Sequence, residues 1–203
     1  MITLRRLDRQ ELREQLEREQ FDVLVIGGGI TGAGVALDAA ARGLRVGLVE
    51  RRDFASGTSS WSTKLVHGGI RYLPQLDIGL VHEALVERGR LIRLAPYLVE
   101  QLPFVLPLYQ FNRHPLGLKR TPPPGLPMSL YVRAGLIAYD LLAGRLNVGR
   151  HRRLSLGEIA RLAPLLRRDD LFDAYAYYDA RTDDARLVMN VLLTAVQHGA
   201  VIC

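Results

Sequence analysis

Residues 21–50 decide the fold, and they read FDVLVIGGGITGAGVALDAAARGLRVGLVE. They begin with a short, β-branched apolar run, Phe21–Ile26, which predicts a strand buried on both faces. A glycine turn then leads into an Ala- and Gly-rich helix, expected over Ile30–Arg42 and closed by Gly43. A second apolar strand, Leu44–Val49, ends at an acid. This order of strand, helix and strand predicts a parallel sheet with a right-handed crossover.

The glycine turn satisfies the pattern G-x-G-x-x-G through Gly27, Gly29 and Gly32. It follows a strand, opens a helix and precedes an acid at the next strand end, so it predicts dinucleotide binding rather than a turn used only for packing. The three glycines would allow a tight turn, close approach of a pyrophosphate, and close packing of helix on strand. The helix N-terminus would offer free N–H donors to the diphosphate. Glu50 would accept hydrogen bonds from the ribose.

Residues 51–69 favour FAD over a nicotinamide dinucleotide. In a nicotinamide-binding fold the chain normally enters another crossover helix soon after the acid. Here the segment RRDFASGTSSWSTKLVHGG has seven Ser, Thr or Lys residues and three glycines, with no apolar stripe at helical spacing. Such a segment suits a long cofactor that needs donors along its diphosphate, ribityl chain and flavin ring. The alternative explanation is a solvated loop.

Periodicity and capping signals predict the remaining elements. Helices are expected over 1–20, Asp77–Leu94, Ser129–Ala143, a short segment opened by a capping box at Ser155 and Glu158, and a segment from Asp183 to His198 closed by Gly199. Strands are expected at Tyr175–Asp179 and at 200–203. Because a core strand is a poor place for a domain to finish, we expect the sheet to continue beyond the last residue, Cys203.

Composition sets further limits. The chain is 48% apolar and 24% charged, which is typical of a globular protein. Residues 1–20 lack the apolar region of a signal peptide, and no apolar run approaches the roughly 20 residues of a spanning helix. The single cysteine, Cys203, excludes an internal disulfide and suits the reducing cytosol.

The net charge of +6 is concentrated in residues 112–153, which carry eight bases and one acid, Asp140, for a net charge of +7. The bases are Arg113, Lys119, Arg120, Arg133, Arg145, Arg150, Arg152 and Arg153. One explanation is a solvated helical face. Another is docking to anionic lipid. Three apolar residues on one side of the expected helix Ser129–Ala143 would then insert into the membrane interface: Leu130, Ile137 and Leu141. Nucleic-acid binding is not expected, because no aromatic interleaving or known module is present.

Several motifs resemble the flavin-dependent, quinone-linked glycerol-3-phosphate dehydrogenases. The likeness covers nearly the whole chain from Phe21, and Trp61 departs from the small or basic residue expected there. The motifs are IGGGITGAGVALDAAARG at 26–43, DFASGTSS at 53–60, STKL at 62–65, HGGIRYL at 67–73 and DDARL at 183–187. The family also has a second signature and further substrate-binding basic residues downstream, which this chain does not include.

The resemblance implies an α/β fold: a Rossmann-like FAD-binding domain of the glutathione-reductase or amine-oxidase-like type, with an inserted α+β substrate (cap) domain. The expected division is an amphipathic N-terminal helix at 1–20, the first part of the FAD-binding domain at 21–75, the cap and membrane-contacting region at 76–180, and a truncated return to the FAD-binding domain at 181–203. The implied reaction converts sn-glycerol 3-phosphate to dihydroxyacetone phosphate, with hydride transfer to flavin and electrons passed to a membrane quinone. An oxidase that uses oxygen and a truncated, non-catalytic FAD-fold module are the alternatives. This fragment alone is expected to be inactive.

Four side chains are candidates for direct roles. His67 could act as general base or support the flavin ring by a hydrogen bond. Arg71 could bind phosphate bidentately, with Tyr72 donating to the same anion, or it could pair with a nearby carboxylate. Lys64 could neutralise cofactor charge or be solvated. The expected cofactor contacts are Gly27, Gly28, Gly29, Thr31, Gly32, Glu50, Thr58, Ser59, Ser60, Lys64, His67, Gly68 and Gly69.

No metal site is expected. The four other histidines, His82, His114, His151 and His198, lack metal-ligand spacing, and Asp38 falls in mid-helix, where a structural role is expected. The expected partners are glycerol 3-phosphate, a membrane quinone, an anionic membrane surface and a second copy of the chain in a homodimer. The expected location is the cytoplasm, at the inner face of the cell membrane.

Overall fold

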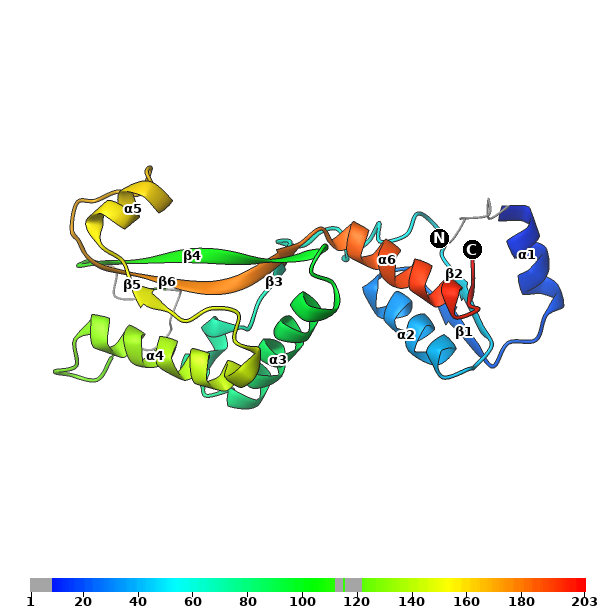
Figure 1. Ribbon diagram of the computed structural model, residues 1–203, viewed down its shortest axis with the longest axis horizontal. Coiled ribbons are helices and arrows are strands. Elements are labelled where there is room, and N and C mark those ends of the chain that lie inside the picture. Colours follow the sequence, from blue (N-terminus) through cyan, green and yellow to red (C-terminus); the bar gives the residue numbers. More distant parts are fainter. Residues whose placement is uncertain (1–8, 112–114, 116–121) are drawn as a thin grey trace. The chain divides into compact units, whose positions relative to one another are not determined.

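The computed structural model describes residues 9–111, 115 and 122–203 (Figure 1). They form two compact units, Met1–Lys64 with Asp183–Cys203, and Leu65–Thr182, so the second is inserted into the first. The sequence instead places residues 65–75 with the first unit. The difference arises because β3 (Leu65–Val66) pairs with a strand of the second unit and η1 (Ile70–Gln75) packs against its helices.

The first unit is built on a parallel sheet with the strand order β1-β2-β7. Its strands are β1 (Val23–Ile26), β2 (Val46–Val49) and β7 (Val201–Ile202). Two helices, α2 (Ile30–Ala41) and α6 (Asp184–Gln197), share one apolar core with this sheet. The predicted parallel β-α-β unit is therefore confirmed.

One prediction for the first strand is wrong. Although β1 is expected to be buried on both faces, Leu24 is 59% exposed and Ile26 is 85% exposed. The core formed with α2 and α6 covers only the face that carries Val25. On the opposite face of the sheet, α1 (Arg9–Arg18) packs against Gly47 of β2, where a Cβ would lie 2.9 Å from Cδ2 of Leu16.

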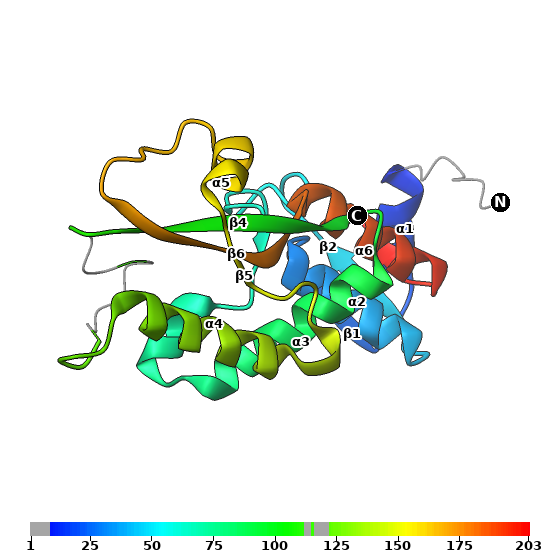
Figure 2. The ribbon, with the colours of Figure 1, turned by 60° about the vertical axis from the view of Figure 1, so that its left-hand side comes forward.

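The second unit is an antiparallel sheet covered on both faces (Figures 1 and 2). Its central strand, β6 (Leu171–Thr182), pairs with each of the others, which are β3, β4 (Val99–Tyr109) and β5 (Arg152–Arg153). Both views show α3 (Ile78–Leu94) and α4 (Met128–Ala143) on one face and α5 (Leu156–Leu162) on the opposite face. A short 3-10 turn, η3 (Gly144–Leu146), follows α4.

The predicted helices are present in the described residues, and the predicted ends that lie within the described range differ from the observed ones by at most two residues. The N-terminal helix is described only from Arg9. Asp77 and Asp183 cap α3 and α6, each accepting a backbone N–H. The capping box is also confirmed: Ser155 N–H donates to the Glu158 carboxylate at 2.9 Å. That bond, with the Arg152 guanidinium, lowers the Glu158 pKa to about 2.

Helix α4 has one buried face and one exposed face. Its buried residues are Val132, Leu136, Tyr139 and Ala143, which join the core with α3 and the sheet. The three residues that the sequence assigns to membrane insertion, Leu130, Ile137 and Leu141, are all exposed. None of the helices in the described part of the chain has the length and apolarity that a membrane crossing requires.

The two faces of α4 predict opposite results for the same substitution. Leu136 is 1% exposed, so Leu136→Ala in the full-length protein should lower the free energy of unfolding by about 3 kcal/mol through lost burial and a cavity. Leu141, on the same helix, is 74% exposed, and Leu141→Ala should leave stability nearly unchanged. Chemical denaturation measures both. Equal losses would contradict the assignment of the buried face.

Candidate functional site

Two positions of the glycine turn in the first unit require glycine, one because of its backbone conformation and one because of its close packing. Gly27 has a φ of +112°, a conformation that only glycine adopts readily. A Cβ at Gly32 would lie 1.9 Å from the Gly27 carbonyl oxygen. The start of α2 therefore packs directly on the backbone that leaves β1, as the motif predicts.

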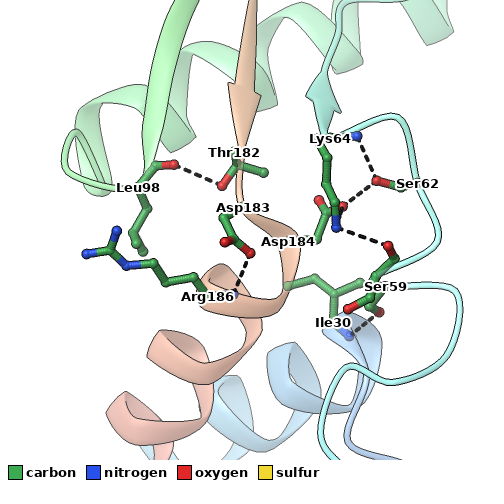
Figure 3. Close-up of polar contacts among 10 residues, drawn as sticks. Ile30, Ser59, Ser62, Lys64, Leu98, Thr182, Asp183, Asp184 and Arg186 are labelled. Carbon is green, nitrogen blue, oxygen red and sulfur yellow. Dashed lines mark hydrogen bonds and ion pairs between the residues drawn. The ribbon is translucent and has the colours of Figure 1, made fainter.

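The N-terminus of α2 lies open to a ligand at the same turn. Its N-cap residue, Gly29, has no side chain to accept the first N–H groups, which also lack partners within the helix. Ile30 N–H donates to the Ser59 hydroxyl at 2.9 Å (Figure 3). A Cβ at Gly29 would lie 3.0 Å from that same hydroxyl oxygen. A narrow, donor-rich cradle of this kind fits a diphosphate.

Glu50 extends this site at the end of β2. Its two carboxylate oxygens accept the backbone N–H groups of Gly28 and Arg52, each at 2.8 Å. The Gly28 bond, followed by the Arg52 bond, lowers the Glu50 pKa below its usual range. The carboxylate is thus held ionised beside the glycine turn, where an acceptor for ribose hydroxyls is predicted.

The hydroxyl-rich loop is tied to α6. The Lys64 ammonium lies 3.3 Å from the Asp184 carboxylate and donates to the Ser60 carbonyl oxygen at 3.0 Å (Figure 3). The Ser62 hydroxyl donates to the same carboxylate. In this structure, Asp184 therefore neutralises the positive charge of Lys64, which the sequence predicts to lie against the cofactor. Thr58 is exposed, as is Thr31 in the first turn of α2.

In the second unit, the exposed candidates follow β3. His67, Arg71 and Tyr72 are exposed, and no hydrogen bond or ion pair of these three side chains occurs among the described residues. The 3-10 geometry of η1 places Ile70 and Leu73 in the core, and so leaves Arg71 and Tyr72 outside. The alternative in which Arg71 pairs with a carboxylate does not occur in the described part of the chain.

Gly68 and Gly69 connect β3 to this turn by different means. Gly69 has a φ of +71°, which turns the chain into η1. Gly68 is buried, and a Cβ there would lie 2.4 Å from the Tyr139 hydroxyl oxygen. Its N–H donates to the Asp179 carboxylate at 2.9 Å.

The buried polar cluster beneath Gly68 is not among the features that the sequence predicts. Asp179 Oδ1 also accepts from the Arg88 guanidinium at 2.6 Å and from the Tyr139 hydroxyl at 2.8 Å. A detectable signal existed. Arg88 follows Val81 and Leu85 at helical spacing on an otherwise apolar stripe, and such a position favours a buried, paired charge.

The remaining polar candidates have structural contacts. Asp38 pairs with Arg42 at 2.9 Å, and the Nδ1 atoms of His82 and His151 lie 2.8 Å from the Leu142 carbonyl oxygen and 2.6 Å from Asp140. His198 is the C-cap of α6, and His114 lies outside the described residues. Across residues 9–111, 115 and 122–203, no cluster of potential metal ligands is present.

Two glycines of α2 provide a matched test of the cradle. Gly32→Ala should abolish FAD binding, because the new Cβ collides with the Gly27 carbonyl oxygen and separates helix from strand. Gly34→Ala adds the same group where no atom lies within 4 Å, so FAD should be retained. Bound flavin is measured from the visible absorption of purified full-length protein. Equal FAD content in the two variants would contradict this assignment.

Comparison with known proteins shows the family of the chain. The sequence profile of the family described as FAD dependent oxidoreductase matches residues 22–203. Glycerol-3-phosphate dehydrogenase 2 of Mycobacterium tuberculosis H37Rv is 48% identical over 191 residues, which are 93% of this chain and 30% of that protein. A probable mitochondrial glycerol-3-phosphate dehydrogenase of Caenorhabditis elegans is 43% identical, over 90% of this chain and 24% of its own length.

Among solved structures, glycerol-3-phosphate dehydrogenase from Bacillus halodurans, complexed with FAD, matches with a TM-score of 0.61 and 33% identity. The match covers 96% of this chain and 28% of that one. The chain thus spans less than a third of the relatives compared. The expected FAD-binding fold, the FAD cofactor and the likeness to glycerol-3-phosphate dehydrogenases are confirmed. The chain belongs to the family of FAD dependent oxidoreductases.

Proposed function

We propose that the full-length protein containing this chain oxidises sn-glycerol 3-phosphate to dihydroxyacetone phosphate. Relatives named glycerol-3-phosphate dehydrogenase are 48% identical over most of the chain. When bound, FAD supplies the acceptor for the hydride from C2 of the substrate. The glycine turn, the α2 N-terminus and Glu50 would hold it. Relatives named as dehydrogenases match 90% or more of this chain, which argues against the alternative of a non-catalytic FAD-fold module.

The observation that carries this proposal is the exposed, unpaired Arg71 guanidinium beside Tyr72. A guanidinium keeps its charge at every working pH and matches a phosphate with two parallel hydrogen bonds. Its backbone is anchored by the buried Ile70 and Leu73, so the charge is offered from a fixed turn. These features suit recognition of a phosphate ester.

His67 is our candidate for the proton acceptor. Its exposed imidazole has no partner among the described residues, so either ring nitrogen is free to take the C2 hydroxyl proton. The second role weighed for it, a hydrogen bond that supports the flavin, uses the same nitrogen atoms.

We further propose that electrons pass to a membrane quinone. The more similar relatives are named dehydrogenases, whereas the glycerophosphate oxidase of Mycoplasma pneumoniae is 20% identical and supports only the fold. An assay with a soluble quinone, run with and without oxygen, tests this choice. Turnover that needs oxygen and produces hydrogen peroxide would favour the oxidase.

A surface of the second unit supports peripheral attachment at the inner face of the cell membrane. Arg152 and Arg153 pair with Glu158 and Asp173, so their charge is compensated. The described arginines left without an acidic partner in that segment are Arg133, Arg145 and Arg150. Together with exposed Leu130, Ile137 and Leu141, they combine cationic and apolar groups, as interfacial helices do. The other bases of the +7 segment, Arg113, Lys119 and Arg120, lie outside the described residues.

Substitution of Arg71 tests the proposed substrate contact. Arg71→Lys keeps the charge but loses the planar fork, so KM for glycerol 3-phosphate should rise about tenfold with FAD content unchanged. Arg71→Ala should raise it further. Steady-state kinetics with glycerol 3-phosphate and with glycerol separate the roles. Intact parameters in Arg71→Ala would refute phosphate binding, and equal losses with both substrates would assign Arg71 to flavin support.

Removal of three unpaired arginines tests the proposed membrane contact. Changing Arg133, Arg145 and Arg150 to Gln should reduce partition onto anionic vesicles about a hundredfold, because each base near such a surface contributes roughly 1 kcal/mol. Salt should release the wild type only in part, since apolar insertion is not screened. A control variant loses three bases of the first unit, Arg9, Arg13 and Arg18. Equal co-sedimentation of all three proteins would favour a solvated face.

A further inference from the structure

The buried cluster of Arg88, Tyr139 and Asp179 holds a carboxylate that most folds would avoid at such a position. Arg88 is 1% exposed and Asp179 is 2% exposed. Two guanidinium nitrogens of Arg88, Nε and Nη2, have no hydrogen-bond partner among the described residues. Removing an ion pair from water costs several kcal/mol per ion, and an apolar set of similar volume is often as stable. Stability alone is therefore a weak explanation for this cluster.

The geometry of the cluster converges on one atom. Asp179 Oδ1 accepts the Arg88 guanidinium, the Tyr139 hydroxyl and the backbone N–H of Gly68, at 2.6, 2.8 and 2.9 Å. Arg88 also donates to the Tyr178 carbonyl oxygen at 2.8 Å and lies over the Tyr139 ring. Two side chains from two helices thus fix the carboxylate, and the carboxylate fixes a backbone amide in the loop after β3.

From this arrangement we infer that Asp179, held by Arg88 and Tyr139, is a positioning residue for the His67–Gly68 peptide. The inference rests on the proposed function, in which His67 accepts a proton. Gly68 is adjacent to His67, so its N–H bond sets the direction in which the imidazole leaves the backbone. Because the acceptor is charged, this bond is stronger than one between neutral groups.

The surroundings of Gly68 leave the peptide little other freedom. A Cβ at Gly68 would lie 2.3 Å from Leu85 Cδ2 and 2.4 Å from the Tyr139 hydroxyl oxygen, so the chain passes against both side chains. Burial first, and then the charge of Asp179, raises the Tyr139 pKa far above its usual range. The hydroxyl consequently remains a neutral donor to Asp179 at every working pH.

His67 and Arg71 should depend on this cluster to different degrees. Arg71 lies on η1, which has anchors of its own in buried Ile70 and Leu73. His67 precedes Gly68 and has no partner of its side chain within the described residues. Loosening Asp179 should therefore displace the proton acceptor more than the phosphate contact, which lowers kcat more than it raises KM.

The same strand offers a matched control. Asp173, also in β6, accepts from Arg153 at 2.7 Å and from the Tyr175 hydroxyl at 3.1 Å, and it is 8% exposed. Its backbone donor is Ala174, its own neighbour in the strand, so this second trio holds no loop of the candidate site. Tyr139→Phe and Tyr175→Phe each remove one tyrosine hydroxyl from an Arg–Asp–Tyr trio.

The experiment compares these two variants in full-length, FAD-loaded protein. Tyr139→Phe should lower kcat about tenfold while KM changes less than about threefold, because small displacements of a reacting group cost rate. It should also shift the visible absorption bands of the bound flavin and speed hydrogen exchange at Gly68. Tyr175→Phe should do none of these, with a similar loss in Tm. Asp179→Asn should act more strongly, but it strands a buried charge, and Tyr139→Phe therefore remains the deciding variant.

The outcomes separate this inference from the proposed function. If both tyrosine variants lower Tm alike and match each other in kcat, flavin spectrum and exchange at Gly68, the cluster is only structural and the inference is overturned. If wild type fails to oxidise glycerol 3-phosphate, the proposed function falls. A flavin spectrum and Gly68 exchange changed only in Tyr139→Phe would still support the positioning role in that case.

Discussion

The Asp179 carboxylate joins the parts of the second unit, because one of its oxygens accepts donors from α3, from α4 and from the loop after β3. The carboxylate lies on the face of β6 that also carries Tyr175 and Tyr177 toward the helices. An unpaired acid there would be costly, and an arginine without it would be equally so. Helix packing, strand pairing and loop conformation are therefore fixed together.

The first unit depends on a backbone contact instead of a charge. Gly32 lies so close to the Gly27 carbonyl that α2 can only pack as it does if position 32 lacks a side chain, and the φ of +112° at Gly27 favours glycine there. The open N-terminus of α2 and the position of the ionised Glu50 beside the glycine turn follow from that placement. The contact between Lys64 and Asp184 then ties the loop that ends this segment to α6, which returns from the far end of the sequence. A cofactor cradle thus results from close packing, with few polar side chains of its own.

The sequence predicted features that depend on local chemistry and missed those that depend on distant partners. The glycine turn, the capping box at Ser155 and the apolar stripes of the helices each lie within a few residues, so their patterns are legible. The long strand β4 was missed because Pro103 and Pro107 argue against a strand. In the sheet order β3-β6-β4 it lies at an edge, where a missing N–H costs little. The exposure of β1 was also missed, because an apolar run does not reveal which faces are covered.

Arg71 and Arg88 show why the candidate site could be predicted only in part. The apolar stripe of Val81 and Leu85 indicates that Arg88 is a core charge. The neighbours of Arg71 in the sequence do not distinguish a ligand contact from an ion pair. In the structure, Arg88 is buried and paired with Asp179. If it left this partner, both charges would remain unpaired in the apolar interior. Arg71 is exposed, carries no counter-ion among the described residues and stands on a turn with two buried anchors. An unpaired guanidinium of that kind can bind an anion without first breaking an ion pair, whereas the Arg88 guanidinium is held in its pair with Asp179.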